Sequence, residues 1–193
     1  MFLSSTPEEA ATGDLAEIYA RERGSWGYLP NYAPLFGHRP QVWHGWRELL
    51  ASVRDHMDRR LYELATVAAA TALKSSYCAL AHGKALTNFY QPQEVAELVQ
   101  DPARLPEGEA EVMRFAALVA SDASAVTAAD VEALRSQGYT DADIFDIAAA
   151  AAARAFFAKL TDALGVEPDW QLGELPVEMV KVLTVGRPIA EPA

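Results

Sequence analysis

Alanine-rich segments bounded by helix-capping residues limit the fold of this chain more than any other feature. About a fifth of the 193 residues are alanine, which has the highest helix propensity of all residues. Alternating Val, Ile and Thr runs closed by Asn-Gly or Asp-Gly, the usual signature of paired strands, are absent from the sequence. The sequence therefore predicts an all-α fold, in which residues 1–193 form one bundle of about eight helices.

Caps, prolines and glycines predict where these helices begin and end. The helices are expected at residues 7–23, 40–55, 59–74, 77–89, 91–100, 105–121, 127–138 and 140–165. The stripe expected to face the core in the second helix consists of Val42, Trp46, Leu49 and Val53. In the third helix nearly all groups from Leu64 to Leu73 are small or apolar, so we expect it to be buried and to pair with the fourth in a helical hairpin.

The C-terminal segment, residues 167–193, has a different composition. Four prolines surround the apolar stretch from Val177 to Val185. A chain of this size has difficulty covering such a stretch by itself, so we expect the segment to be an arm that docks on another subunit. A homo-oligomer is the corresponding prediction.

Charge and cysteine content exclude several function classes. The 27 acidic residues outnumber the 16 basic ones, which gives a net charge of −11. Such a surface repels nucleic-acid phosphates and anionic lipids, so neither nucleic acid nor membrane is expected as a partner. The single cysteine, Cys78, allows no disulfide within the chain and favours a reducing compartment. With no signal peptide evident, a cytoplasmic location is predicted.

Cys78 and His82 are the strongest candidates for chemistry. They are four residues apart on a predicted helix, which places both side chains on one face. Cys78 also falls in the first turn, where the helix dipole favours a thiolate and a nearby imidazole can take the proton. If Glu63 meets His82, it orients the ring and holds its positive form.

Simpler interpretations remain open for each of these residues. A cysteine on an alanine-rich helix is often a small buried hydrophobic group, and a glutamate near a helix N-terminus often serves only the dipole. Tyr77, beside the cysteine, either packs in the core or lines a pocket. The other histidines, His38, His44 and His56, lack the spacing of a metal site, and no metal or cofactor is predicted.

One longer pattern connects these residues to a known family. Glutamate, eleven residues, cysteine, two residues, cysteine, three residues and histidine is the pattern of alkyl hydroperoxidase D and carboxymuconolactone decarboxylase-like proteins. The chain resembles this family at three of the four positions, through Glu63, Cys78 and His82, whereas Ser75 stands at the first cysteine. Residues 29–32 (Leu-Pro-Asn-Tyr) and 162–167 (Asp-Ala-Leu-Gly-Val-Glu) are similar to the peroxidase-related subgroup. The resemblance implies an all-helical, oligomeric fold.

The resemblance also implies a function. In the family the second cysteine is thought to attack the hydroperoxide, with the histidine and glutamate as a proton relay, so Cys78, His82 and Glu63 are the expected catalytic residues. Ser75 cannot form the family's disulfide and at most hydrogen-bonds the sulfur or the substrate. The expected activity is therefore a one-cysteine, thiol-dependent peroxidase of the antioxidant type, with a small hydroperoxide as substrate and an external thiol as reductant.

Two alternatives to this peroxidase keep the same fold. One is a decarboxylase-like enzyme that uses only proton transfer by His82 and Glu63. The other is a non-catalytic helical scaffold.

Overall fold

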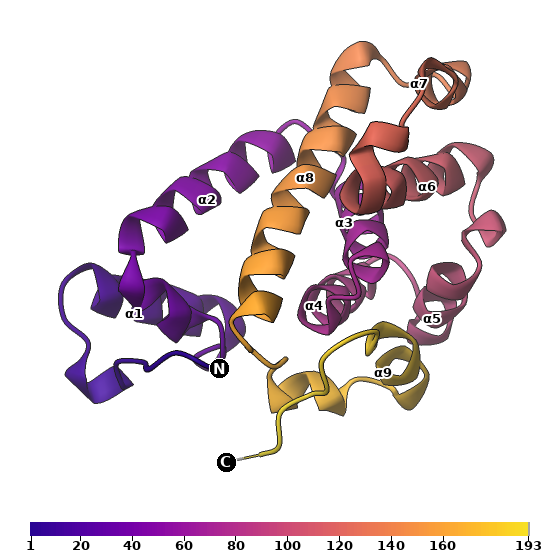
Figure 1. Cartoon of the computed structure of the whole chain (residues 1–193). Coiled ribbons are helices and arrows are strands. Elements are labelled where there is room, and N and C mark those ends of the chain that lie inside the picture. Colours follow the sequence, from indigo (N-terminus) through magenta and orange to yellow (C-terminus); the bar gives the residue numbers. More distant parts are fainter. Residues whose placement is uncertain (193) are drawn as a thin grey trace.

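The computed structural model describes residues 1–192 and shows a helical bundle in which this part of the chain contains no strand (Figure 1). Its α-helices are α1 (Asp14–Trp26), α2 (Pro40–Arg54), α3 (Arg59–Ala72), α4 (Ser76–Leu86), α5 (Pro92–Gln100), α6 (Glu107–Asp122), α7 (Ala128–Ser136), α8 (Asp141–Ala163) and α9 (Val177–Leu183). Short 3-10 helices lie at Glu8–Ala10, Ala33–His38, Pro102–Arg104, Ala123–Ala125 and Trp170–Glu174. The predicted all-α fold is confirmed.

The first predicted helix is wrong in its bounds. Glu8–Ala10 is only a 3-10 turn, and α1 begins at Asp14, after Gly13 has turned the chain with a φ of 55°. The helix then runs through Gly24 and ends where Gly27 adopts the left-handed conformation with a φ of 81°. Gly27, rather than Gly24, is therefore the glycine that terminates the helix.

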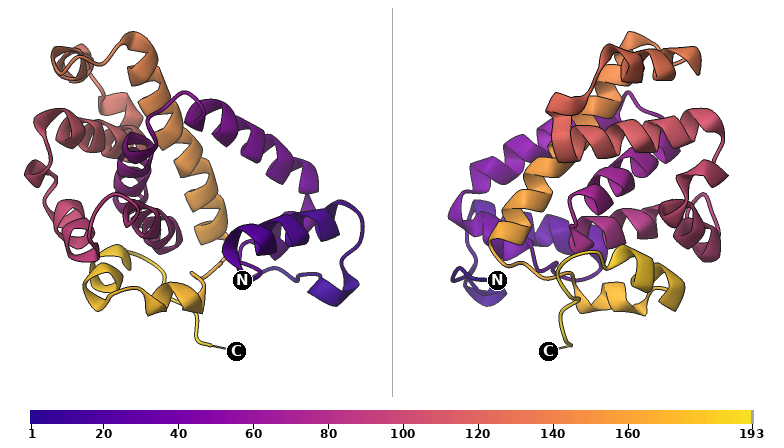
Figure 2. Two further views of the ribbon diagram at one scale, coloured as in Figure 1. Left: turned by 180° about the vertical axis from the view of Figure 1, so that it is seen from behind. Right: turned by 45° about the vertical axis from the view of Figure 1, so that its right-hand side comes forward.

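Helix α3 is the centre of the bundle. Every residue from Tyr62 to Ala70 is buried, as predicted, and the helix packs against α4, α6 and α8. Helix α8 lies between the α1–α2 pair on one side and the group of α3 to α6 on the other, as Figures 1 and 2 show from several directions. This arrangement leaves α2 in contact with α8 and away from most of the hairpin formed by α3 and α4.

The buried face of α2 differs from the predicted stripe. The buried residues are Trp43, Trp46, Leu50 and Val53. Val42 and Leu49 are 41% and 49% exposed. At these two of the four predicted positions the buried residue is the next one along the chain, Trp43 or Leu50. The indole of Trp43 has far more apolar surface to bury than Val42, and its ring lies beneath the guanidinium groups of Arg21 and Arg47.

The C-terminal segment packs on its own chain. Helix α9 contacts α4 and α5, and its Met179 and Leu183 are fully buried. Gly83 of α4 permits this approach, because a Cβ there would lie 2.4 Å from Leu183 Cδ1. The apolar stretch is thus largely covered without a second subunit.

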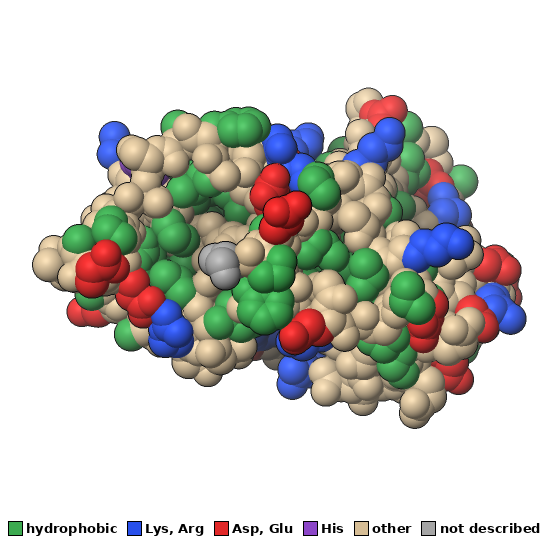
Figure 3. All heavy atoms as spheres, turned by 90° about the horizontal axis from the view of Figure 1, so that it is seen from below, with side chains coloured by type: hydrophobic (Ala, Val, Ile, Leu, Met, Phe, Trp, Pro, Cys, Tyr) green, Lys and Arg blue, Asp and Glu red, His purple; other side chains and the backbone are tan. Residues whose placement is uncertain are grey.

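Part of this segment remains exposed to solvent. Val177 is 79% exposed and Trp170 is 39% exposed. Hydrophobic side chains also gather between charged groups on the face seen from below in Figure 3. Docking of the segment on another subunit stays a prediction.

No helix in residues 1–192 has the length and hydrophobicity needed to cross a membrane.

Candidate active site

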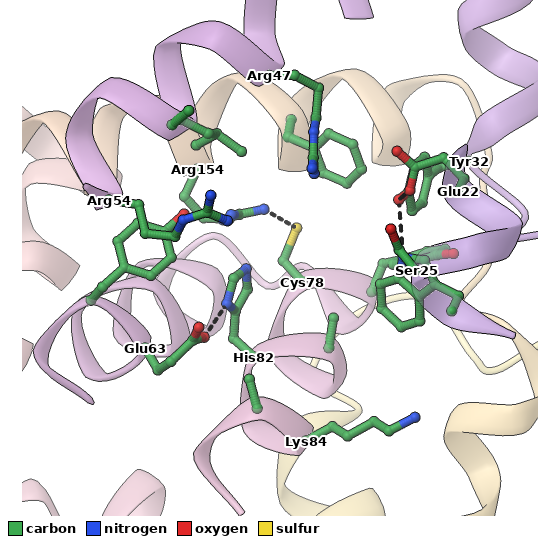
Figure 4. A pocket seen from close by; sticks show the side chains of 18 of the residues that line it. Glu22, Ser25, Tyr32, Arg47, Arg54, Glu63, Cys78, His82, Lys84 and Arg154 are labelled. Atoms are coloured by element: carbon green, nitrogen blue, oxygen red, sulfur yellow. Dashed lines mark hydrogen bonds and ion pairs between the residues drawn. The ribbon is translucent and has the colours of Figure 1, made fainter. Parts of the chain in front are cut away.

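A cavity of about 960 Å³ lies between α1 and α2 on one side and α3, α4 and α8 on the other. Cys78, His82 and Glu63 all line it, together with Tyr77 and Arg154 (Figure 4). The structure thus brings the three residues of the sequence pattern to one cavity. Its volume is typical of sites for organic molecules rather than of a passage for a single small peroxide.

Cys78 lies in the first turn of α4, and the residue is only 1% exposed. The guanidinium of Arg154 donates to the sulfur, with Nη1 3.8 Å from Sγ. Burial raises the pKa of the Cys78 thiol, and the charge of Arg154 lowers it by less. The prediction of a thiol that ionises more easily than in water is therefore wrong, because loss of hydration outweighs the charge of Arg154.

His82 and Glu63 form a direct pair across the α3–α4 hairpin. His82 Nδ1 lies 2.6 Å from a Glu63 carboxylate oxygen and 3.1 Å from Thr66 Oγ1. The Thr66 hydroxyl donates to the carbonyl of Tyr62 at 2.7 Å, so its oxygen is free to accept from the imidazole. Both acceptors therefore place the ring proton on Nδ1.

The charges of this pair differ from the predicted ones. Burial lowers the pKa of His82, and Arg154 lowers it further, so the ring is neutral at neutral pH despite Glu63. Burial raises the pKa of Glu63, but its interaction with His82 and the charge of Arg154 bring it below the usual value. The prediction that Glu63 holds a positive imidazole is wrong. The arrangement is an ionised carboxylate on a neutral ring.

The second ring nitrogen of His82, Nε2, points away from Glu63 toward the part of the cavity that holds Cys78 and Arg154 (Figure 4). A neutral ring with its proton on Nδ1 has a free lone pair on Nε2, so His82 can act as a base there. No hydrogen bond joins His82 directly to the Cys78 sulfur among the residues the structure describes. The two groups share the cavity instead.

Ser75 and Tyr77 flank the cysteine without joining this arrangement. Ser75 occupies the N-cap position of α4 and is fully buried, and its hydroxyl has no hydrogen-bond partner within residues 1–192. It does not line the cavity. Tyr77 does line the cavity, but its hydroxyl donates to Asp169. Tyr77 therefore contributes a ring face to the wall.

Arg154 is the site residue that the sequence reasoning missed. It comes from the middle of α8, is 4% exposed, and places its guanidinium beside Cys78. The signal was present: Arg154 is the only charged residue between Asp146 and Lys159, in an otherwise apolar run. A charge in such a run must be buried with a partner or a function.

The remaining histidines serve other contacts. His38 Nε2 lies 3.0 Å from the carbonyl oxygen of Ser4, and His56 Nδ1 lies 2.7 Å from that of Ser52. Within the described part of the chain, no group of three or more His, Cys, Asp or Glu side chains is arranged to hold a metal ion.

No protein-family model matches the sequence. A comparison with curated proteins also finds no match. Solved structures, in contrast, match over nearly the whole chain. An alkylhydroperoxidase core structure, an uncharacterized peroxidase-related protein from Ralstonia eutropha, has 22% identity and a TM-score of 0.77, covering 96% of this chain and 97% of that one. A peroxidase-related protein from Silicibacter has 21% identity and a TM-score of 0.73, covering 89% and 91%.

A third similar structure carries a different activity. It is the debrominase Bmp8 in complex with 2,3,4-tribromopyrrole, in a variant with one cysteine replaced by alanine. The identity is 15% and the TM-score 0.72, with 95% of this chain and 96% of that one covered. At such identities the likeness establishes the architecture and leaves the reaction to the site. The chain has the alkyl hydroperoxidase D-like helical fold.

Proposed function

We propose that this protein is a thiol-dependent peroxidase of the alkyl hydroperoxidase D family that works with one cysteine, Cys78. One observation carries the proposal: the sulfur lines a cavity that it shares with a neutral imidazole, oriented by a carboxylate, and with a buried guanidinium. A thiol needs a base to lose its proton and a positive charge to stabilise the anion that forms. His82 and Arg154 supply these two functions.

The oxidation step follows from the protonation states. The thiol is protonated at rest, so its proton passes to His82 Nε2, directly or through one water, as the sulfur attacks the terminal oxygen of the hydroperoxide. The S–O bond forms, the O–O bond breaks, and the leaving alkoxide takes up the proton held by His82. The products are a sulfenic acid on Cys78 and an alcohol. Glu63 stabilises the imidazolium formed during the transfer.

Reduction of the sulfenic acid requires an external thiol. Ser75 offers no sulfur, and the chain has no other cysteine. One thiol condenses with the sulfenic acid to give a mixed disulfide and water, and a second thiol releases Cys78 as the free thiol. The cavity must therefore admit a small thiol after the alcohol leaves.

A second candidate uses the same fold without the sulfur. The Glu63–His82 pair is complete without Cys78, and its free Nε2 faces a cavity large enough for an organic molecule. A decarboxylase-like proton transfer would need only this pair. Loss of activity in His82→Ala with retention in Cys78→Ala would support this second candidate.

The setting of the reaction is part of the proposal. A lone thiol that depends on an external reductant fits a reducing compartment, so we place the protein in the cytoplasm. Exposed Val42 and Leu49 on α2 and Val177 on α9 support assembly as a homo-oligomer.

The test is a short pulse of hydroperoxide followed by a reagent that traps sulfenic acids, with the adduct located by mass spectrometry. We expect one adduct per chain on Cys78, none in Cys78→Ser, and loss of the adduct when a small thiol is added before the trap. The urea-unfolded protein is the control for an ordinary thiol, and the folded protein should react at least about tenfold faster. A folded thiol no faster than the unfolded one contradicts the proposal and favours a scaffold role.

A further inference from the structure

The cavity has the opposite charge balance to the molecule. The whole chain carries 27 acidic and 16 basic residues. The cavity is lined by only two acidic side chains, Glu22 and Glu63, and by six basic ones: Arg21, Arg47, Arg54, Arg59, Lys84 and Arg154. Positive charge is thus concentrated in one hollow of an acidic protein.

The cavity cations also differ from the other arginines in their partners. Of the seven arginines outside the cavity, all but Arg39 are within ion-pair distance of a carboxylate: Arg23, Arg60, Arg104, Arg114, Arg135 and Arg187. Of the six cavity cations, only Arg54 is within ion-pair distance of a carboxylate, at 3.9 Å from Asp55. The other five have no carboxylate partner in residues 1–192. Positive charges gathered without counter-charges repel one another, and an anion in the cavity removes that cost.

The two acidic side chains in the cavity are hydrogen-bonded to groups other than the cavity arginines. Glu22 is buried and accepts a hydrogen bond from the Tyr32 hydroxyl. Glu63 is engaged with His82. Neither lies within ion-pair distance of a cavity arginine among the described residues. The lining of the cavity therefore carries an excess of positive charge.

Burial makes the unpaired charge costly at one position in particular. Arg154 is 4% exposed, and its Nε has no hydrogen-bond partner in residues 1–192. Its Nη1 is directed to Cys78. Arg47, which is half-buried, and Arg54 extend from α2 toward the same space, so three guanidinium groups surround the approach to the sulfur (Figure 4). Arginines in this arrangement are typical of carboxylate recognition.

Aromatic side chains form another part of the wall. Trp46 and Phe157 stack with ring centroids 4.4 Å apart and an interplanar angle of 18°, and both line the cavity. Tyr62 and Tyr77 line it from the hairpin side. Flat apolar surfaces of this kind bind the body of an aromatic or planar molecule, while the charged groups fix its orientation.

We propose that the cavity binds an organic anion, in which a carboxylate on a flat hydrophobic body is held by Arg47 and Arg54 and the reacting group lies at Cys78. Arg154 already donates to the sulfur, so the carboxylate is bound by the two arginines of α2. This proposal rests on the proposed function for the identity of the reacting group, an organic hydroperoxide. The binding of the anion can be tested without any reaction.

The binding test uses Cys78→Ser, which cannot be oxidised, and two probes of matched shape, 4-isopropylbenzoate and 4-isopropylbenzamide. We expect the carboxylate to bind at least about tenfold more tightly than the amide in calorimetry at low salt, with the difference shrinking as salt is added. Equal affinity of the two probes, or no binding of either, overturns the proposal. Because no sulfur chemistry takes part, this result is independent of whether Cys78 reacts with peroxide.

Variants then locate the anion. In the Cys78→Ser background, Arg47→Gln should weaken the carboxylate about tenfold and leave the amide unchanged. The matched control is Arg135→Gln, which removes the same charge on α7, outside the cavity. If both variants weaken the carboxylate equally, the effect is one of overall charge and the assignment to Arg47 is wrong. Arg54→Gln provides a second test on an exposed position of α2, where folding is not at risk.

The matching kinetic test uses cumene hydroperoxide and its para-carboxylate with the wild-type protein. We expect sulfenic acid to form on Cys78 about tenfold faster with the carboxylate at limiting concentration, and this preference to disappear in Arg47→Gln. Reaction with both compounds at one rate contradicts the anion proposal and leaves the peroxidase proposal intact. Binding of the benzoate without any oxidation of Cys78 contradicts the peroxidase proposal and leaves the anion proposal intact.

Discussion

The two walls of the cavity are built in different ways. The α3–α4 hairpin supplies Glu63, Cys78 and His82 from one short stretch of sequence, with each side chain placed by helical spacing. The opposite wall, from α2 and α8, supplies Arg47 and Arg154 from positions far apart in the sequence. The hairpin provides the groups that exchange a proton and form a bond, and Arg154 of the other wall lowers the pKa of both Cys78 and His82.

A local motif determines which groups meet in the site but not their protonation states. The hairpin alone, with a thiol at a helix N-terminus and a carboxylate on the imidazole, predicts a thiolate and an imidazolium. Burial, acting with the charge of Arg154 on His82, produces a neutral thiol and a neutral ring instead.

The largest effect is expected for His82→Asn in the hairpin. Without the base, oxidation of Cys78 by hydroperoxide at neutral pH should slow by about 10² or more. Because the pKa of His82 is lowered, the wild-type ring stays neutral below its ordinary pKa of 6.5, and the wild-type rate should fall only at still lower pH. The variant should lack this acid limb. The measurement is the rate of sulfenic acid formation across pH.

Alkaline pH provides the control for this prediction. Burial raises the pKa of the Cys78 thiol, so without a base the thiol ionises only at higher pH than an ordinary cysteine does. The defect of His82→Asn should therefore shrink as the pH rises through that pKa. A defect of the same size at every pH would mean that His82 has a structural role and that the hairpin carries no proton relay.

The sequence was sufficient for most of the fold and for one wall of the site. Seven of the eight predicted helices begin within two residues of the observed ones, because proline, threonine and aspartate caps act locally. The sequence placed Glu63 and His82 on the two helices of one predicted hairpin but left their meeting as a condition, which the structure fulfils. These features depend on neighbours in the sequence.

The other wall depends on tertiary packing, so the lone charge of Arg154 in its apolar run does not reveal which group it meets. Arg154 reaches Cys78 because α8 crosses the hairpin, and residues 78 and 154 are far apart in the chain. The burial of Trp43 in place of Val42 on α2 likewise reflects tertiary packing, which places the Trp43 ring beneath Arg21 of α1. Burial of the sulfur follows from the same packing, and the sign of the pKa shifts follows from burial.

A smaller effect is expected for Arg154→Gln, which removes the charge from the second wall. The pKa of the Cys78 thiol should rise further, because the cation that opposes burial is lost, and oxidation should slow by about tenfold. The pKa of His82 should rise as well, since Arg154 now lowers it. Both shifts can be measured, by thiolate absorbance and by nuclear magnetic resonance of the ring. Arg154→Lys, which keeps the charge, should bring the pKa values of Cys78 and His82 most of the way back to those of the wild type.

The matched control is Arg60→Gln on α3, which breaks a contact with Glu109 away from the cavity. Arg60→Gln should leave the pKa values of Cys78 and His82 unchanged. If Arg154→Gln leaves the rate and both pKa values at their wild-type values, the hairpin is sufficient by itself and the two walls do not cooperate.

The smallest effect is expected for Tyr77→Phe, which tests where the hairpin's contribution ends. The Tyr77 hydroxyl donates to Asp169, which also accepts from the backbone N–H of Asn31 and from the hydroxyl of Tyr28. Loss of one of three bonds in a buried place should lower the free energy of unfolding by about 1 kcal/mol in urea denaturation and leave the oxidation rate unchanged. Tyr28→Phe is the matched control: it bonds the same carboxylate from a half-buried position and should cost less. A tenfold loss of rate in Tyr77→Phe with unchanged stability would instead give the hydroxyl a part in the reaction, and the catalytic wall would then extend from Cys78 to the residue beside it.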